Sequence, residues 1–420
     1  MTTSSEVLPG GVSSGARALG VLDGRDFVVA SSKGAWLTDT YGDRFVDYGM
    51  AMGANLLGHA TPAVVEACTA ALRNGSMPGF TNVLELRAAE ALVRIGGDRV
   101  TRATFTTTGT EAVQLAIRAA RGKTGRQLIA KTVGGYDGWM DNIRFGLVES
   151  PEAERTNARP VQLDVTLLRI NDSNDLEELF REYGNDLAAI LIEPILGNTA
   201  CLVPTPDWIA QLNALCAQYG VKIISDEVMA GLRTGFGLVA DTIGLKADYV
   251  SMGKAIGTGV PVAALLGTED AFSVFADKSV PRYGTYHGNP LVAAALIATT
   301  DFLATADYQA GLFDYGAKMR AGIVAAYAAE GLSVCTAGFD AVFSLWFTDT
   351  PPQTYDAAMA ALNPTASRLN YEALRRNGVI ALPSPWGRYF ASFSHGEAEL
   401  EVTLAAFRAA AASVAAAKCL

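Results

Sequence analysis

A single lysine stands out in the stretch SMGKAIGTGVPVAALLG, which runs from Ser251 to Gly267. Lys254 lies among small, apolar and glycine residues, with no carboxylate beside it in the sequence. A lysine that is removed from water has a lowered pKa, so its amine can attack an aldehyde and form a Schiff base. The alternative is structural, because lysines beside apolar runs commonly extend their ammonium group to water. The stretch alone does not decide between these two roles.

Two acidic residues follow an apolar run directly in VKIISDEV, residues 221–228. A carboxylate at the carboxyl end of a central strand faces the crevice where α/β proteins bind ligands. A buried anion needs a partner, and the protonated pyridine nitrogen of a cofactor would supply one. Asp226 is therefore a candidate partner for such a ring, and Val228 could pack against one ring face. The alternatives are a capping aspartate on a solvent-facing loop and an ordinary core valine.

Small hydroxyl and glycine residues mark the junction of a strand and a helix in FTTTGTEAVQLAIRAARG, residues 105–122. Free backbone N–H groups and the positive end of a helix converge at such a junction, which suits a phosphate group. Thr108, Gly109 and Thr110 are the candidate phosphate ligands. The same residues could instead form an ordinary helix cap that binds nothing.

An aromatic side chain lies between glycines in GGYDGWMDN, residues 134–142. The glycines would allow the backbone to approach a ligand, and Tyr136 could stack on the second face of a flat cofactor. A purely structural tyrosine is the alternative for any single aromatic residue.

Repeated strand, turn and helix units must position these candidates. From about residue 104, short apolar runs alternate with amphipathic helical stretches, a pattern typical of a mostly parallel sheet covered on both faces. Before it, residues 36–48 (WLTDTYGDRFVDY) predict a hairpin that turns at Tyr41-Gly42-Asp43. After Asn289-Pro290 an alanine-rich helix leads to VFSLWFT, RYFASFSH and a final helix, which indicate a smaller α+β domain.

Composition narrows the class of protein. The formal net charge of -10 argues against nucleic-acid binding through bulk electrostatics. The five cysteines form no CxxC pair, so neither a disulfide framework nor a metal site is expected, and a reducing cytosol fits best. No apolar run reaches about 18 residues and the start MTTSSEVLPGG lacks a leader pattern, so we expect a soluble cytoplasmic protein without a membrane partner.

Taken together, the motifs resemble class III aminotransferases, which are pyridoxal-phosphate enzymes of fold type I. Within that family the pattern is most similar to the glutamate-1-semialdehyde 2,1-aminomutase branch. The resemblance runs over nearly the whole chain and is carried by PGGVSSGAR, YGDRFVDY, LLGHATP, TTGTEAV, GYDGW, IEPILGN, DEVMAGLR, SMGKAIGTGVPV and GTYHGNP.

The resemblance implies an α/β fold, with a large domain on a mostly parallel seven-stranded sheet and a smaller α+β domain from both termini. The implied divisions are residues 1–60, which join the small domain, 61–305, which bind the cofactor, and 306–420, the C-terminal small domain. It also implies a homodimer with shared active sites, in which Thr285 reaches the phosphate in the neighbouring subunit.

The resemblance assigns roles to the candidate residues as well. Lys254 would carry pyridoxal 5'-phosphate as an aldimine and move the substrate proton. Asp226 would pair with the pyridinium nitrogen. Val228 and Tyr136 would pack against the two faces of the cofactor ring. Thr108, Gly109 and Thr110 would hold the phosphate, and Glu193 would support the site without acting in the chemistry.

Three residues are implied on the substrate side. Arg17, in GGVSSGAR, matches an arginine that binds a substrate carboxylate in the aminomutase-like branch. Met52 stands where the aminomutase has a tryptophan, and Gly387 stands where it has a glutamate. The next residue, Arg388, could reach a second anionic group or form a salt bridge at the rim. A further departure is Tyr136-Asp137-Gly138, where many relatives have Tyr-His-Gly.

The sequence therefore predicts an aminotransferase that acts on a small carboxylate-bearing amino donor, such as a β-amino acid or a biosynthetic intermediate, and on a keto or aldehyde acceptor. The loss of the glutamate argues against the rival function, a 2,1-aminomutase. A noncatalytic scaffold of the same fold is a third reading, which the joint presence of Lys254, Asp226 and the phosphate residues disfavours.

Overall fold

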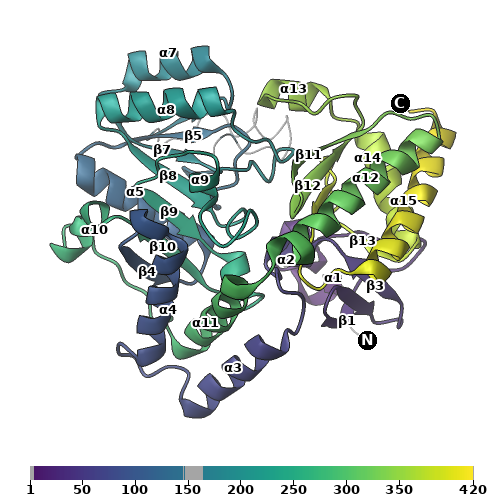
Figure 1. The fold of residues 1–420 in the computed structure, drawn as a ribbon, viewed down its shortest axis with the longest axis horizontal. Coiled ribbons are helices and arrows are strands. Elements are labelled where there is room, and N and C mark those ends of the chain that lie inside the picture. The colour runs from purple at the N-terminus through teal and green to yellow at the C-terminus, as the bar shows by residue number, and fades with distance from the viewer. Residues whose placement is uncertain (1–3, 145, 147–163, 420) are drawn as a thin grey trace.

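The computed structural model describes residues 4–144, 146 and 164–419, which form a larger and a smaller part (Figure 1). The larger part contains a seven-stranded sheet, and the smaller part gathers strands and helices from both ends of the chain. Purple N-terminal strands lie beside yellow-green C-terminal helices in Figure 1. The α/β fold expected from the sequence is confirmed, including the small part built from both termini.

The central sheet has the strand order β4-β10-β9-β8-β7-β5-β6. Neighbouring strands from β9 to β6 run parallel, whereas β10 is antiparallel to both β4 and β9. Every residue of β7 is buried, as expected for a strand covered on both faces. The strands are β4 (Arg102–Thr106), β5 (Leu128–Thr132), β6 (Val165–Leu168), β7 (Leu187–Ile192), β8 (Lys222–Glu227), β9 (Tyr249–Met252) and β10 (Ala263–Gly267). The sequence patterns anticipate all of these except β6.

The helix that follows β4 starts at the cap that residues 108–110 offer. Helix α5 (Gly109–Thr124) starts at a capping box made by Thr108 and Glu111, and Gly125 ends it in the left-handed conformation. Others are α3 (Pro62–Asn74), α4 (Val83–Ile95), α7 (Ser173–Tyr183), α8 (Pro206–Tyr219), α10 (Glu269–Ala276) and α11 (Pro290–Thr305).

The smaller part contains two sheets. Strands β1 (Val29–Lys33), β2 (Trp36–Asp39) and β3 (Arg44–Asp47) pair with β13 (Val379–Ile380), while β12 (Val342–Trp346) lies between β11 (Cys335–Phe339) and β14 (Arg388–Phe390). The predicted hairpin is confirmed, because β2 and β3 pair antiparallel. The helices of this part are α12 (Asp314–Ala329), α13 (Tyr355–Ala360), α14 (Pro364–Arg376) and α15 (Glu397–Ala417).

The remaining elements are short. They are α1 (Ser4–Val7), α2 (Met50–Gly53), α9 (Val239–Thr242), the 3₁₀ turns Pro9–Gly11, Gly15–Arg17, Gly97–Arg99 and Lys254–Gly257, and a π-helical segment at Gln309–Phe313. Among the described residues, one helix, α15, has the length and apolar composition that crossing a membrane requires. The bent pair of α11 and residues 309–329 meets the same two criteria, which core helices of soluble proteins also meet. Helix α15 packs against α12 and α14, as a core helix does.

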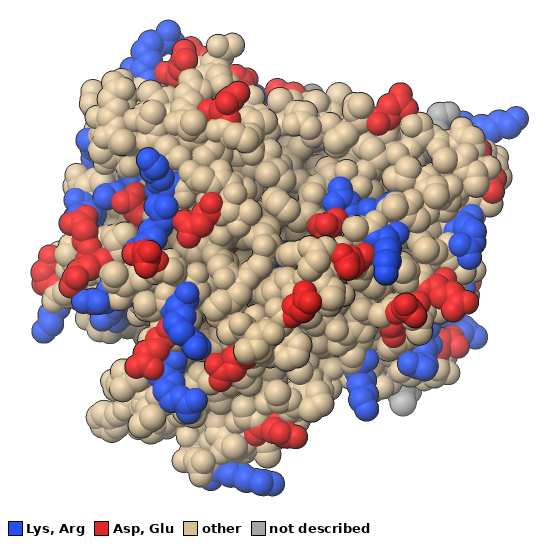
Figure 2. Space-filling model, in the orientation of Figure 1, with Lys and Arg blue, Asp and Glu red and all other residues tan. Residues whose placement is uncertain are grey.

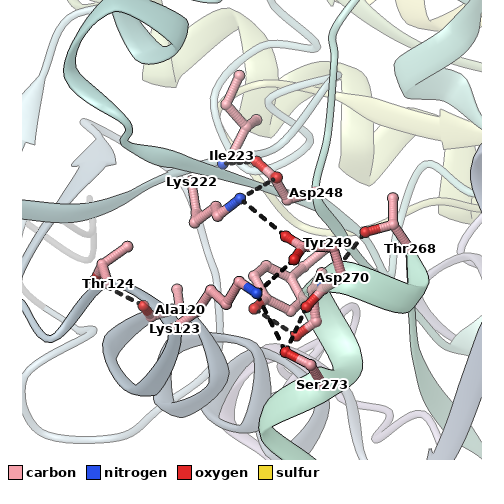
Figure 3. A network of polar contacts seen from close by, with 11 residues as sticks. Ala120, Lys123, Thr124, Lys222, Ile223, Asp248, Tyr249, Thr268, Asp270 and Ser273 are labelled. Atoms are coloured by element: carbon pink, nitrogen blue, oxygen red, sulfur yellow. Dashed lines mark hydrogen bonds and ion pairs between the residues drawn. The ribbon is translucent and has the colours of Figure 1, made fainter.

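An ion-pair network joins the amino ends of β8 and β9 to two helices (Figure 3). Asp248 accepts a hydrogen bond from the backbone N–H of Ile223 at 2.9 Å and one from the Lys222 ammonium at 2.9 Å. Asp270 of α10 contacts both Lys123 of α5 and Lys222. The network therefore stabilises the end of the sheet opposite to the carboxyl ends of β8 and β9.

Candidate active site

A cavity of about 290 Å³ lies where the carboxyl ends of β8 and β9 meet the amino end of α5. The structure brings eight of the predicted residues into its lining: Thr108, Gly109, Thr110, Tyr136, Glu193, Asp226, Val228 and Lys254. They come from five separate segments of the chain. Strands that run parallel bring their carboxyl ends to one edge of the sheet, which explains how these distant segments converge.

The start of α5 forms a cup for an anion. The Glu111 carboxylate accepts the N–H groups of Thr107 at 2.8 Å and Thr108 at 2.9 Å, and the Thr108 hydroxyl accepts the N–H of Glu111. Within the described residues, the N–H groups of Gly109 and Thr110 have no protein acceptor. These two donors at the positive end of a 16-residue helix suit a phosphate.

Close packing explains why glycine occupies two positions of this cup. A Cβ atom on Gly109 would lie 2.6 Å from a methyl group of Val228. At Gly138, where φ is +110°, a Cβ atom would lie 2.8 Å from the Thr110 hydroxyl. The two glycines therefore let Val228 and the loop after Tyr136 close against the start of α5.

Two buried carboxylates lie at the ends of β7 and β8. Asp226 is 4% exposed, and its Oδ1 accepts the N–H of Val228 at 2.9 Å. Glu193 is 2% exposed and accepts N–H groups from Tyr136 at 2.7 Å and Gly197 at 3.2 Å. Burial, followed by the negative charge of Asp137, raises the pKa of Asp226 and raises that of Glu193 to about 7. A positively charged group in the cavity would stabilise both carboxylates in their ionised form.

Lys254 is the second residue after β9 and opens a 3₁₀ turn, with its backbone in the left-handed region at φ 46°. Burial lowers the pKa of Lys254 to about 8, and the positive charge of Arg388 is the next largest cause. The uncharged fraction of this amine near neutral pH is therefore larger than that of an ordinary exposed lysine. The amine can act as the nucleophile that the sequence predicts.

Two buried arginines lie near Lys254. Arg388 is 9% exposed; its Nη1 donates to the carbonyl of Gly197 and, at 2.7 Å, to Oδ1 of Asn198, which lines the cavity. Arg233 is fully buried, and both guanidinium groups lie over the ring of Phe390. No carboxylate among the described residues forms an ion pair with Arg388. The salt bridge that was the alternative role for this arginine is therefore not seen in the described part of the chain.

Four predicted residues lie outside the cavity lining: Arg388, which contacts the lining residue Asn198, and Thr285, Arg17 and Met52. Thr285 is exposed in the segment before α11, and Arg17 is exposed in the 3₁₀ turn Gly15–Arg17. Met52 is half-buried in α2, where three consecutive non-glycine residues have positive φ. Their roles toward phosphate and substrate stay predictions.

Sequence reasoning missed one pair beside the cavity. Lys131, the charged residue within the apolar strand QLIAKT, lies 2.8 Å from Asp137, and both side chains are fully buried. A charged residue in such a run, followed by a departure from the usual Tyr-His-Gly, was the available signal.

The cavity residues fit a pyridoxal phosphate group. They offer an amine for its aldehyde, free N–H donors for its phosphate, a buried carboxylate for its ring nitrogen, and Val228 and Tyr136 for its ring faces. The fold and this arrangement of residues together define a pyridoxal-phosphate enzyme of fold type I.

Comparisons with known proteins agree. The family described as aminotransferase class-III matches residues 22–333. The chain is 35% identical over 417 residues to the glutamate-1-semialdehyde 2,1-aminomutase of Deinococcus radiodurans, covering 95% of this chain and 93% of the relative. A solved transaminase with pyridoxal phosphate bound has a TM-score of 0.85 at 28% identity over 99% of both chains. A β-phenylalanine aminotransferase from Variovorax paradoxus has a TM-score of 0.85 at 26% identity, over 96% of this chain and 91% of that one.

The chain therefore belongs to the class III aminotransferases, and its cofactor is pyridoxal 5'-phosphate.

Proposed function

We propose that the protein is an aminotransferase that moves an amino group from a carboxylate-bearing donor to a keto or aldehyde acceptor. The bound cofactor supplies the aldehyde that receives the amino group and a ring that withdraws electrons. Lys254 would hold the cofactor and transfer the proton at the reacting carbon. The Asp226 carboxylate would stabilise the protonated ring nitrogen, and Val228 and Tyr136 would orient the ring.

The observation that carries this proposal is the arginine at position 388. Its guanidinium is buried close enough to Lys254 to lower the pKa of that amine, and no described carboxylate neutralises it. A substrate carboxylate would supply the missing counter-charge and bring the amino group to Lys254. The similarity to the β-phenylalanine aminotransferase supports a β-amino acid as one donor class.

A 2,1-aminomutase is the second candidate, and the relative from Deinococcus radiodurans supports it. Against it stands Gly387, at the position of the mutase glutamate. Its φ is +51°, a backbone conformation that favours glycine and makes glutamate unfavourable. We expect the reaction to need a second substrate for this reason.

Labelled nitrogen separates the two functions. A nitrogen-15 donor incubated with the enzyme should pass its label to a different carbon skeleton, and turnover should stop without an acceptor. Efficient isomerisation of glutamate-1-semialdehyde with the label kept on the same skeleton would overturn the proposal.

Arginine variants locate the carboxylate. Arg388→Gln should raise the KM for acidic donors about 30-fold or more, because a charge-assisted hydrogen bond contributes roughly 2 kcal/mol or more. The same measurement on Arg17→Ala tests the clamp predicted from the sequence, since Arg17 is exposed in this subunit. An unchanged KM in both variants would leave the substrate carboxylate without a partner and contradict the proposal.

The active unit is proposed to be a cytoplasmic homodimer. Apolar side chains at residues 77–86 and 283–286 are exposed, including Phe80 at 85% and Tyr283 at 90%. Asn82 donates to the carbonyl of Gly288 at 3.1 Å, which joins the two segments into one surface. Burial of this surface in a dimer would remove it from water and would carry Thr285 towards the partner.

A further inference from the structure

The loop that carries Tyr136 is closed by a buried lysine. The Lys131 ammonium donates to the carbonyl of Gly135 at 2.9 Å and to that of Ile143 at 2.8 Å, and lies 2.8 Å from Oδ2 of Asp137. One side chain of β5 thus ties Gly135 to Ile143 within the described part of the loop. Two carbonyl groups accept hydrogen bonds from the ammonium group, and the Asp137 carboxylate supplies its counter-charge.

The Asp137 carboxylate is buried without a hydrogen-bond donor among the described residues. Both side chains of the pair are fully buried, and Asp137 belongs to the cavity lining together with Asp226 and Glu193. Neither Oδ1 nor Oδ2 of Asp137 has a hydrogen-bond partner within the described residues; Oδ2 has the ion pair with Lys131, and Oδ1 has no ion pair there either. A buried carboxylate oxygen without a partner is costly, so this wall of the cavity favours a positively charged or hydrogen-donating occupant.

The charged groups around this wall come from several elements. Negative charges are contributed by Asp137 in the loop, Glu193 after β7 and Asp226 at the end of β8; positive charges are contributed by Lys131 of β5, Lys254 after β9, Arg388 of β14 and Arg233 in the turn after β8. Asp137 acts on both neighbouring carboxylates, since its charge raises the pKa of Asp226 and of Glu193. The pair therefore influences the groups that surround the ring.

We propose that the Lys131–Asp137 ion pair is a positioning device for the cofactor: Lys131 holds the Tyr136 loop over the ring, and Asp137 assists Asp226 in keeping the cofactor protonated. The inference needs only the cofactor of the family and not the proposed substrates.

The experiment follows the visible absorbance of the bound cofactor as a function of pH, without substrate. Asp137→Asn keeps an oxygen for Lys131 but removes the negative charge, so the pH midpoint of the absorbance change should fall by roughly half a unit or more. Lys131→Gln removes the positive charge and should move the midpoint upwards. Asp270→Asn, in the network at the opposite end of the sheet, is the matched control and should leave the midpoint unchanged.

Opposite shifts in the two variants distinguish an electrostatic role from a structural one. A loop that was merely loosened would move both midpoints in the same direction, and that result would overturn the proposal. So would an Asp137→Asn midpoint within error of the Asp270→Asn control. If Lys131→Gln does not fold, the comparison of Asp137→Asn with the control decides alone, and cofactor titration of the two folded apoproteins measures any change in retention separately.

Discussion

At the scale of single residues, the site depends on an amine that is made reactive by its surroundings. Lys254 is half-buried at the end of β9, and its pKa is lowered to about 8 by burial and by the positive charge of Arg388. An ordinary exposed lysine, with a pKa near 10.4, would be almost fully protonated at neutral pH. Burial therefore gives this lysine a much larger fraction of free amine.

Replacement of the lysine tests its identity as the cofactor residue. Lys254→Ala should keep the fold but lose turnover by several orders of magnitude, because the variant lacks both the nucleophile and the proton carrier. Borohydride treatment should fix the cofactor covalently to the native protein and not to the variant, as measured by peptide mass. Lys246→Ala, an exposed lysine, is the control, and normal turnover in Lys254→Ala would refute the assignment.

The lowered pKa also predicts a pH dependence. Only the uncharged amine reacts with the cofactor, so the rate at which the apoprotein develops visible absorbance with added cofactor should rise with pH and level off above about pH 8. Because the charge of Arg388 contributes to the lowering, Arg388→Gln should move the midpoint to higher pH. A rate that keeps rising beyond pH 10 in the native protein would show an unperturbed lysine.

At the scale of elements, β8 and β9 position Asp226 and Lys254 at their carboxyl ends, and their amino ends are joined by Asp248. This carboxylate accepts a backbone hydrogen bond from Ile223 and an ion pair from Lys222 (Figure 3). The contact is half-buried, with side-chain exposures of 21% and 26% for Lys222 and Asp248. It therefore stabilises the register of the two strands more than a surface ion pair would.

Removal of this contact should cost stability. Asp248→Ala should lower the free energy of unfolding by about 1 to 3 kcal/mol, because it leaves the Ile223 N–H without its acceptor and removes the nearer of the two carboxylates that contact Lys222. Asp270→Asn, whose side chain is 68% exposed, should cost less than about 1 kcal/mol. Urea unfolding of the apoproteins measures both, and equal losses would contradict the distinction.

At the scale of the whole molecule, the exposed apolar surface on residues 77–86 and 283–286 is the feature that an isolated chain leaves unexplained. On the face drawn in Figure 2, charged side chains (blue and red) are dispersed, and residues without a charge (tan) occupy much of the centre. The proposed dimer would bury apolar groups of this surface and couple association to cofactor binding.

A charge in that surface should separate the subunits. Phe80→Glu is expected to shift the protein towards monomer and to weaken cofactor retention, since Thr285 could then no longer reach the phosphate in the partner. Analytical ultracentrifugation with and without cofactor measures both effects. Val324→Glu, at a less exposed position on α12, is the control. A fully active monomer would exclude the shared site.

The sequence by itself determined the local pieces of this protein. A strand with Asp226 near its carboxyl end, a strand shortly before Lys254 and a helix capped by Thr108 are each encoded within a few residues, by apolar periodicity and capping. These signals predicted the mostly parallel sheet correctly, and eight of the residues that they singled out line one cavity. They could not reveal the antiparallel direction of β10, because pairing direction depends on the path of the chain between strands.

Only the tertiary structure decided which distant side chains meet. It placed Arg388 of the small part near Lys254, left Arg17 exposed, and paired Lys131 with Asp137 behind the Tyr136 loop. The physical reason is that burial and Coulomb interactions depend on distances in the folded molecule, whereas sequence spacing constrains only neighbours along the chain. The chemistry of the cofactor is therefore visible in local motifs, while the charges that tune it arise from long-range packing.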